Sequence, residues 1–337
     1  MDRNDRLCVN CFHVVRGGYE VCPFCGFVEG GAPKEACQLR PGTILDERYI
    51  IGEAIGQGGF GITYKAFDTN LGTTVAVKEF YPSRYVNRAE NETKVSVFSG
   101  KKSEEYNKML ARFLEEARNA AIFSKEPDIV NVLAYFESNH TAYMIMEYIE
   151  GTLLKQRLKE DGRLEQQEAC TYMCAILRAL SKLHAKGIIH RDIGPDNIFL
   201  TGEDTIKLLD FGTARFQNSE SEKNLSVVVK PGYSPPEQYL SKGKQDARMD
   251  IYAAGAVFFL MLTGHRPMEA LERRDNERLD FTGKSGIKIN ARLKEDIVRA
   301  LSLNPEERFA SADEFRAAIE EHGKNVPRSG FFERFRR

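Results

Sequence analysis

The sequence predicts an α+β protein in which a small metal-binding ribbon precedes a β-rich lobe and a helical lobe. Two Cys-x-x-Cys pairs occur within residues 1–28. Short β-rich runs then dominate residues 43 to about 148, and helical periodicity dominates residues 149 to about 323. This order predicts two domains, with the cleft between them as the natural ligand site.

Four cysteines in the first segment predict a metal site. Cys8 and Cys11 form one pair, Cys22 and Cys25 form the other, and the segment is too short to build a hydrophobic core of its own. Four thiolates favour Zn²⁺ and leave no open coordination position, so the predicted role is structural. Iron in a rubredoxin-like site is the competing interpretation. Because no basic cluster accompanies the cysteines, we expect a protein partner, or docking to the lobes, rather than nucleic acid.

Residues 29–42 contain Gly30, Gly31, Pro33 and Pro41 and are predicted to form a linker. Beyond it, β-rich runs separated by turn residues predict strands, and apolar residues at helical spacing predict helices. The expected strands cover 49–55, 61–67, 73–80, 94–98, 130–136 and 141–148. The expected helices cover 106–121, 166–185 and 250–263.

Bulk composition limits the partners and the compartment. The 337 residues include 48 basic and 49 acidic side chains, so no global field points to nucleic acid. The polar N-terminus lacks the apolar stretch of a signal peptide, and the longest apolar run, 251–262, is too short to cross a bilayer. We therefore expect a cytoplasmic protein without a transmembrane segment. The basic, aromatic tail, 324–337, is predicted to be a disordered end, with weak association with a surface as the alternative.

Residues 56–61, Gly-Gln-Gly-Gly-Phe-Gly, match the pattern Gly-x-Gly-x-x-Gly. The pattern alone is weak evidence, because dinucleotide-binding folds use it too. Here β-rich runs flank it on both sides, whereas a dinucleotide-binding turn opens a helix at its last glycine. It therefore predicts a hairpin loop whose backbone amides cover phosphates. Lys78, in Val-Ala-Val-Lys on a following strand, is predicted to pair with the phosphates of the nucleotide.

A second set of polar residues lies in the helical lobe. His190-Arg191-Asp192 is followed by Asn197 and then by Asp210-Phe211-Gly212. With the glycine-rich loop and Lys78, this ordered set resembles the eukaryotic-type (Hanks-type) protein kinase family, and more closely its bacterial serine/threonine kinases, over Thr43 to about Gly323. Pro235-Pro236-Glu237 resembles the family's Ala-Pro-Glu, and residues 304–309 resemble its late arginine motif. The resemblance implies a bilobal protein-kinase-like fold.

The resemblance also implies catalytic roles in the transfer of a phosphoryl group. Lys78 would hold the α- and β-phosphates and would itself be held by a helix carboxylate, Glu116 in preference to Glu115. Asp192 would orient or accept the proton of the attacking hydroxyl. Asn197 and Asp210 would bind Mg²⁺ or Mn²⁺ through hard oxygen atoms.

Further roles follow from the same resemblance. The implied ATP-binding residues are Gly56, Gln57, Gly58, Gly59, Phe60, Gly61, Thr63, Ala76, Lys78, Met146, Glu147 and Tyr148. Glu237 and Arg308 would form a buried ion pair that anchors the substrate loop. Arg191 and Asp250 would be structural, Asp250 by bracing the catalytic loop, and Asp250 is also a candidate N-cap of its helix.

Two departures from the family pattern stand out. The lysine that normally follows the catalytic aspartate by two residues is Gly194, and the threonine that normally meets this lysine is Lys230. We hypothesise that Lys230 supplies the lost charge near the γ-phosphate. The alternative is a solvated lysine in a slow or inactive enzyme. The candidate phosphorylation sites, which would pair with Arg191, are Thr213, Ser219, Ser221 and Ser226. Residues 80–108 are longer than the family's usual connection and have no assigned role.

These motifs predict a serine/threonine protein kinase that transfers phosphate from ATP to a hydroxyl of a protein substrate. The alternative is a pseudokinase scaffold with a zinc-dependent interaction module. The complete set of Lys78, Asp192, Asn197 and Asp210 argues against the scaffold, because a scaffold has no need of metal ligands. A small-molecule kinase of the aminoglycoside type fits less well, since Glu237 and Arg308 resemble an anchor for a protein-substrate loop.

Overall fold

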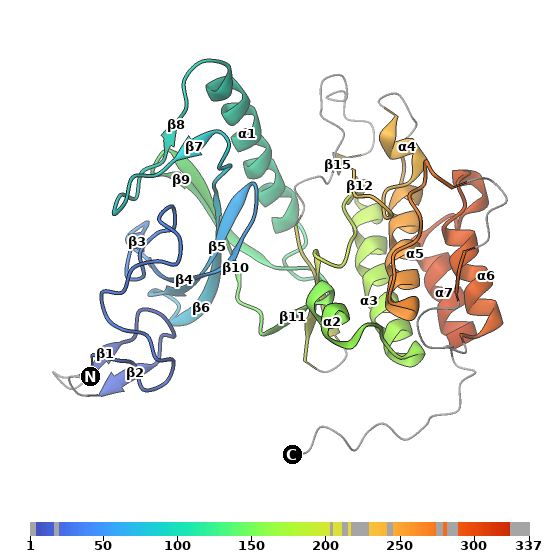
Figure 1. Cartoon of the computed structure of the whole chain (residues 1–337), viewed down its shortest axis with the longest axis horizontal. Helices are drawn as coiled ribbons and strands as arrows, with labels where there is room; N and C mark the ends of the chain where they lie inside the picture. Colours follow the sequence, from blue (N-terminus) through green and yellow to red (C-terminus); the bar gives the residue numbers. More distant parts are fainter. Residues whose placement is uncertain are drawn as a thin grey trace. The chain divides into compact units, whose positions relative to one another are not determined.

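The computed structural model describes residues 5–16, 20–202, 205–210, 215–216, 229–240, 245–273, 279–281 and 289–323. It divides into two compact units (Figure 1). The first unit comprises residues 1–125 and 130–149, and the second comprises 126–129 and 150–337. Each unit is described by itself.

A six-stranded sheet is the centre of the first unit. Its order is β3-β4-β5-β6-β10-β9, and every neighbouring pair is antiparallel. Its strands are β3 (Ile44–Leu45), β4 (Tyr49–Gln57), β5 (Gly61–Asp68), β6 (Thr73–Phe80), β9 (Val132–Ser138) and β10 (Thr141–Glu147). Alternate residues of β5 are buried, as expected for a strand with one face on a core.

Strand β4 is interrupted before it reaches the glycine-rich loop. Ile51 pairs with Ala66, but the next partners are Ala54 and Tyr64, so two residues of β4 oppose one residue of β5. Such a bulge leaves a backbone group without a partner in the ladder. A second shift of register occurs between Ala54 and Gly56.

Helix α1 (Lys101–Ala121) packs against β9 and β10 (Figure 1). The buried residues of the helix include Tyr106, Phe113 and Ala117. Phe80, the last residue of β6, places its ring 5.4 Å from the rings of Tyr106 and Phe113. The connection from β6 to α1 contains a short hairpin, β7 (Val86–Asn87) with β8 (Ser96–Val97). The ribbon contributes another hairpin, β1 (Asp5–Leu7) with β2 (Val14–Arg16).

Helices and two small sheets form the second unit. The sheets have the orders β11-β13-β14 and β12-β15. Their strands are β11 (Gly151–Leu153), β12 (Ile188–Ile189), β13 (Ile198–Thr201), β14 (Thr205–Leu208) and β15 (Arg215–Phe216). The helices are α2 (Leu154–Asp161), α3 (Gln166–Ala185), α4 (Pro236–Tyr239), α5 (Arg248–Thr263), α6 (Ala291–Ala300), the 3₁₀ turn η2 (Pro305–Glu307) and α7 (Ala312–Gly323).

Helix α5 is the buried core of this unit, and helices α3 and α6 pack on it. It begins at Arg248, and Ala247 is its N-cap. The expectation that Asp250 caps the helix is therefore wrong: Asp250 lies within the first turn and turns its carboxylate to other partners. Gly264 ends the helix in the left-handed conformation, which a glycine adopts without strain. Among the helices that the structure describes, none combines the length and the apolar character that a membrane-spanning segment requires.

Candidate functional site

In the first unit, Lys78 is held by a carboxylate of helix α1. Its Nζ lies 2.9 Å from Glu116 Oε1, and the ring of Phe113 lies beneath the ammonium, with its centroid 5.8 Å from Nζ. Glu116 is buried, whereas Glu115 is exposed on another face of the helix. Lys78 pairs with Thr63 of β5 on one side and with Met144 of β10 on the other, so its backbone is fixed by two strands.

The glycine-rich segment joins β4 to β5. Gln57 pairs with Ile62, Gly58 N donates to Gly61 O at 2.9 Å, and Phe60 is exposed at the tip. Ala76 lies opposite Lys65 on β5 and opposite Met146 on β10. In the first unit, the strand residues predicted to bind ATP thus lie on the hairpin β4-β5 and on the next two strands of the sheet, β6 and β10.

The predicted hinge residues end strand β10. Met146 pairs with Ala76, and Glu147 pairs with Val75. Glu147 is engaged with Asn131 twice: its N–H donates to Asn131 O at 3.0 Å, and its Oε1 accepts from Asn131 N at 2.9 Å. The Glu147 amide is therefore already occupied as a donor. The ring of Tyr148 lies 4.9 Å from Lys65 Nζ.

In the second unit, the carboxylate of Asp250 anchors the segment His190-Arg191-Asp192. Oδ2 of Asp250 accepts from His190 N and His184 Nε2, and Oδ1 accepts from Arg191 N, each at 2.8 Å. Burial alone would raise the pKa of Asp250, but its hydrogen bond to His184, its electrostatic interactions with His184 and His190, and the bond from the Arg191 amide outweigh burial and hold the pKa below its ordinary value. The carboxylate thus stays charged and fixes the main chain just before Asp192.

Among the described residues of this unit, two adopt the left-handed conformation without being glycine. Arg191 has φ 68° and Asp210 has φ 57°. Such conformations persist where surrounding contacts determine them, and they concentrate at functional sites. Arg191 is held by Asp250 and by Gln238, whose Nε2 donates to Arg191 O at 2.9 Å, and its guanidinium bonds Gln245.

Asp192 is held from two sides. Asn197 Nδ2 donates to Asp192 Oδ2 at 2.9 Å and to Asp192 O at 2.8 Å. Lys230 Nζ lies 2.7 Å from Asp192 Oδ1 and 2.8 Å from Asp196 Oδ1. Burial lowers the pKa of Lys230, but the two carboxylates outweigh burial and raise the pKa above its ordinary value, so the ammonium remains charged.

The missing side chain at Gly194 makes room for this ammonium. A Cβ atom at position 194 would lie 2.7 Å from Lys230 Nζ, 3.0 Å from Lys230 Cδ and 2.9 Å from Asp196 Oδ1. Lys230 itself is fixed by a turn, because its N–H donates to Ser234 Oγ at 2.9 Å. The two departures from the family pattern are therefore spatially linked: the volume left by one is filled by the other.

Asn197 and Asp210 lie at the same end of the hairpin β13-β14. Ile198 pairs with Leu208, and the ladder continues one step further, since Leu209 N donates to Asn197 O at 2.8 Å. Asp210 follows directly. The two bonds from Asn197 Nδ2 to Asp192 fix the orientation of the amide, which leaves Oδ1 as its ligand atom. An amide oxygen and a carboxylate are ligands that fit Mg²⁺.

Glu237 and Arg308 form a buried, bidentate ion pair. Nη1 of Arg308 lies 2.6 Å from Glu237 Oε1, and Nη2 lies 3.0 Å from Oε2. Arg308 also donates to the carbonyls of Ser302 and Arg248 at 2.8 and 3.0 Å. The pair joins the segment that carries Lys230 to the end of the domain.

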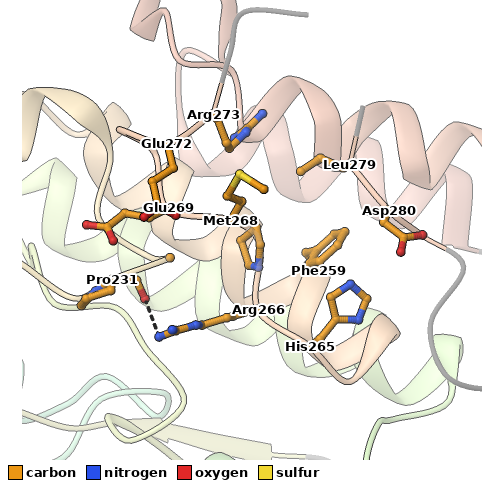
Figure 2. Close-up of a pocket in the computed structure, with 12 residues that line it drawn as sticks. Pro231, Phe259, His265, Arg266, Met268, Glu269, Glu272, Arg273, Leu279 and Asp280 are labelled. Carbon is orange, nitrogen blue, oxygen red and sulfur yellow. Dashed lines mark hydrogen bonds between the residues drawn. The ribbon is translucent and has the colours of Figure 1, made fainter. Parts of the chain in front are cut away.

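A cavity of about 480 Å³ lies beside the same segment. Figure 2 shows Arg266 reaching toward Pro231, whose carbonyl accepts from Nη1 at 3.4 Å. Phe259 and Met268 contribute apolar side chains to its lining, and Glu272 contributes a charged one (Figure 2). The cavity therefore begins one residue after Lys230.

The four ribbon cysteines come together as expected. Their sulfur atoms lie within 4.8 Å of one another, with Cys8 and Cys25 at 3.8 Å and Cys11 and Cys22 at 3.6 Å. A tetrahedron with Zn–S bonds of about 2.3 Å has S···S edges of about 3.8 Å, so the set fits zinc. Burial raises the pKa of the Cys22 thiol, but bonds from the Phe24 and Cys25 amides and from the Cys8 and Cys11 thiols outweigh it and lower the pKa to about 7. Burial raises the pKa of the Cys11 and Cys25 thiols above the ordinary value.

Comparison with known proteins decides the family, because the protein kinase domain model matches residues 49–317. The chain belongs to the protein kinase domain family. A probable serine/threonine-protein kinase of Clostridium acetobutylicum is 34% identical over 282 residues, 81% of this chain and 39% of that protein. Serine/threonine-protein kinase PknA of Nostoc sp. is 32% identical over 287 residues, 82% of this chain and 48% of that protein. The chain thus spans less than half the length of these curated relatives.

A solved structure described as "PpkA-294 apo form" is 32% identical, has a TM-score of 0.74 and covers 84% of this chain and 99% of that one. The predicted α+β fold and the resemblance to bacterial protein kinases are confirmed. In this kinase domain Asp196, Gln238 and His184 are contact residues that sequence reasoning missed. Only Asp196 carried a signal, since it stands between Gly194 and Asn197 in the motif. The candidate phosphorylation sites Thr213, Ser219, Ser221 and Ser226 and the tail 324–337 lie outside the described residues.

Proposed function

We propose that this kinase domain transfers the γ-phosphate of ATP, with Mg²⁺, to serine or threonine hydroxyls of proteins. The observation that carries the proposal is the arrangement around Asp192, where an amide and an ammonium hold both carboxylate oxygens. An acceptor carboxylate held in this way is prepared to orient a hydroxyl group, which is the positioning that phosphoryl transfer requires. The names of the relatives support serine and threonine as acceptors.

The chain's own residues divide the work of positioning. Lys78, oriented by Glu116, provides a cation for the α- and β-phosphates. Asn197 Oδ1 and the Asp210 carboxylate would hold Mg²⁺, which when bound neutralises charge on the phosphate oxygens. Asp192 receives or directs the proton of the acceptor hydroxyl.

Lys230 provides the cation that the catalytic loop lacks. Its ammonium touches Asp192, the place where the acceptor hydroxyl would be held, and its raised pKa keeps it charged at neutral pH. The developing negative charge on the transferred group would be stabilised by a fixed positive charge at this point. The fit of Lys230 into the space beside Gly194 supports a replacement rather than an unrelated surface lysine.

A polypeptide acceptor is supported by the surroundings of Lys230. The segment after Lys230 is anchored by the Glu237–Arg308 pair, and the cavity of Figure 2 opens beside Pro231 and Gly232. A chain that presents its hydroxyl to Asp192 could continue past this cavity. A free small molecule would make no use of it.

We also propose that the Cys8, Cys11, Cys22 and Cys25 site holds a structural Zn²⁺ and that the protein works in the cytosol. Four thiols that must remain reduced to bind metal favour a reducing compartment. A protein partner for the ribbon belongs to the same proposal, since no basic cluster surrounds it.

The test is incubation of the purified chain with labelled ATP, Mg²⁺ and a generic protein substrate. We expect label on serine or threonine of the substrate, and its loss in Asp192→Asn and Asp210→Ala. A fluorescent ATP analogue measures nucleotide binding separately. Binding of the analogue without any transfer of label would favour the pseudokinase scaffold instead.

A further inference from the structure

We propose that the segment between the ribbon and the sheet positions the nucleotide-binding loop, and that Gln38 is the residue that does so by holding Gln57. Gln38 Nε2 donates to Gln57 Oε1 at 2.7 Å, and Gln57 Nε2 donates to Cys37 Sγ at 3.6 Å. Gln38 is buried, whereas Gln57 is otherwise exposed. The inference rests on the proposed function, because it assumes that residues 56–61 bind ATP.

Gln38 can hold the loop only if it is itself fixed, and a buried polar network fixes it. Arg88 Nη1 donates to Cys37 O at 2.6 Å, and Leu39 N donates to Tyr64 Oη at 3.0 Å. These two bonds lie on either side of Gln38 in the chain. The Gln38 side chain is oriented in addition by Glu35 N, which donates to its Oε1 at 3.3 Å.

The network has Glu79 at its centre, the residue directly after Lys78. Its carboxylate accepts from Tyr64 and Tyr143 hydroxyls, each at 3.0 Å, and forms an ion pair with Arg88. Burial raises the pKa of Glu79 despite the opposing effect of Arg88 and the two tyrosines. Burial lowers the pKa of Arg88, but Glu79 outweighs burial and raises the pKa above its ordinary value, so the guanidinium keeps its charge. Because a half-satisfied buried pair is costly, the pair holds its partners in one arrangement.

This network also gives the connection between β6 and α1 a role. Arg88 comes from that connection, directly after β7, and joins β6 to the segment at Cys37. The residues from 80 to 108, unassigned by the sequence, thus supply the cation that binds the N-terminal segment to the sheet. The same contact fixes the strand that carries Lys78.

The ribbon itself also contacts the sheet, at the bulge of β4. Glu53 N, one of the two residues of the bulge, donates to Asn10 Oδ1 at 3.0 Å, so the ribbon satisfies a donor that the ladder omits. The ring of Phe12 lies 5.5 Å from that of Phe67. A Cβ atom at Gly52 would lie 3.1 Å from Phe12 Cζ and from Asn10 O, so glycine permits this approach.

The expected consequence concerns the affinity for the nucleotide. A loop held near its bound conformation loses less conformational entropy when it closes over phosphates. One neutral hydrogen bond contributes a factor of about 2 to 10. We therefore expect Gln38→Ala to raise the Kd for a nucleotide about 2- to 10-fold, with little change in the KM for the protein substrate.

The experiment is a double-mutant cycle on the full chain, with the Kd of a fluorescent ATP analogue and Mg²⁺ as the readout. The variants are Gln38→Ala, Gln57→Ala, the double variant, and Glu35→Ala as a control that removes an exposed side chain of the same segment. If Gln38 acts through Gln57, the double variant binds no more weakly than Gln57→Ala alone, and Glu35→Ala binds as the wild type does. Circular dichroism and zinc content verify that each variant is folded.

Two results would overturn the inference: an unchanged Kd in Gln38→Ala, or losses that simply add in the double variant. Wild-type protein that fails to bind the analogue would instead refute the proposed function. The two failures are therefore distinguishable.

Discussion

Replacement of Lys230 by alanine removes the cation that lies 2.7 Å from Asp192 Oδ1. The relevant interaction is the one between this ammonium and the negative charge on the transferred group. Two unit charges about 4 Å apart interact by about 4 kcal/mol at an effective dielectric constant of about 20. The Lys230 side chain is 23% exposed, so solvent screens part of this energy. We take about 2 kcal/mol as the loss of transition-state stabilisation, which corresponds to about a 30-fold decrease in kcat.

The assay is steady-state transfer of labelled phosphate to a protein substrate, with the nucleotide Kd measured separately. We expect kcat to fall and the nucleotide Kd to stay within about twofold, because the lost charge acts on the transferred group and not on the bound ground state. Lys159→Ala, which removes an exposed lysine of α2, is the matched control for the change in net charge. The raised pKa of Lys230 also predicts no loss of activity from its deprotonation between about pH 6 and about pH 9.

A second variant tests the link between positions 194 and 230. A lysine at 194 in the Lys230→Ala background returns a cation to the catalytic loop, and we expect it to recover most of the lost kcat. Gly194→Ala alone should lower kcat, because the new Cβ atom would lie only 2.7 Å from the present position of Lys230 Nζ and would displace the ammonium. Wild-type turnover in Lys230→Ala, or an equal loss in Lys159→Ala, would refute the reasoning.

Three further predictions concern stability and metal. Glu237→Gln leaves Arg308 as an unpaired buried charge and should lower the free energy of unfolding in urea by about 3–5 kcal/mol. The control Glu320→Gln, which removes a charge from an exposed pair, should lower it by less than about 1 kcal/mol. Similar losses in the two variants would contradict the assignment. The hydrogen bonds from Arg48 lower the pKa of Asp68 in the folded protein. The Asp68 carboxylate therefore stabilises the fold fully above the ordinary carboxyl pKa of about 3.9, and this stabilisation is lost as the pH falls through the lowered pKa of the folded state. Urea unfolding should therefore show that Asp68→Asn loses less stability than the wild type between about pH 5 and about pH 2, and parallel curves would count against this. Cys11→Ser removes one of the four sulfur ligands and should abolish Zn²⁺ binding, as measured with a metal-sensitive dye. The amide of Glu53 should then exchange its hydrogen faster, because its acceptor, Asn10 Oδ1, belongs to the ribbon. Loss of metal with unchanged exchange would show that the ribbon docks without zinc.

Features set by residues close together in the sequence could be predicted best. Strands β4, β5, β6 and β10 lie within two residues of their expected ends, because each has a β-rich run bounded by turn residues. The spacing of the Cys-x-x-Cys pairs indicated a metal site, and the joint order of the motifs around Lys78, Asp192 and Asp210 resembled that of the protein kinase family. The start of α5 was misplaced by two residues because Asp250 is a good capping residue by type, and nothing local shows that its carboxylate serves His184 and the amides of residues 190 and 191.

The sequence by itself determined the order of the elements and the cysteine pairs, because periodicity, residue type and spacing are properties of the chain alone, and its ordered motifs carried the resemblance to the family. Tertiary structure alone decided which distant side chains meet: the ammonium of Lys230 with Asp192 and Asp196, and the segment at Cys37 with Arg88. The physical reason is that such contacts depend on strand register, on the space left by a residue such as Gly194, and on the burial that makes an ion pair form at one place. None of these is a property of neighbouring residues.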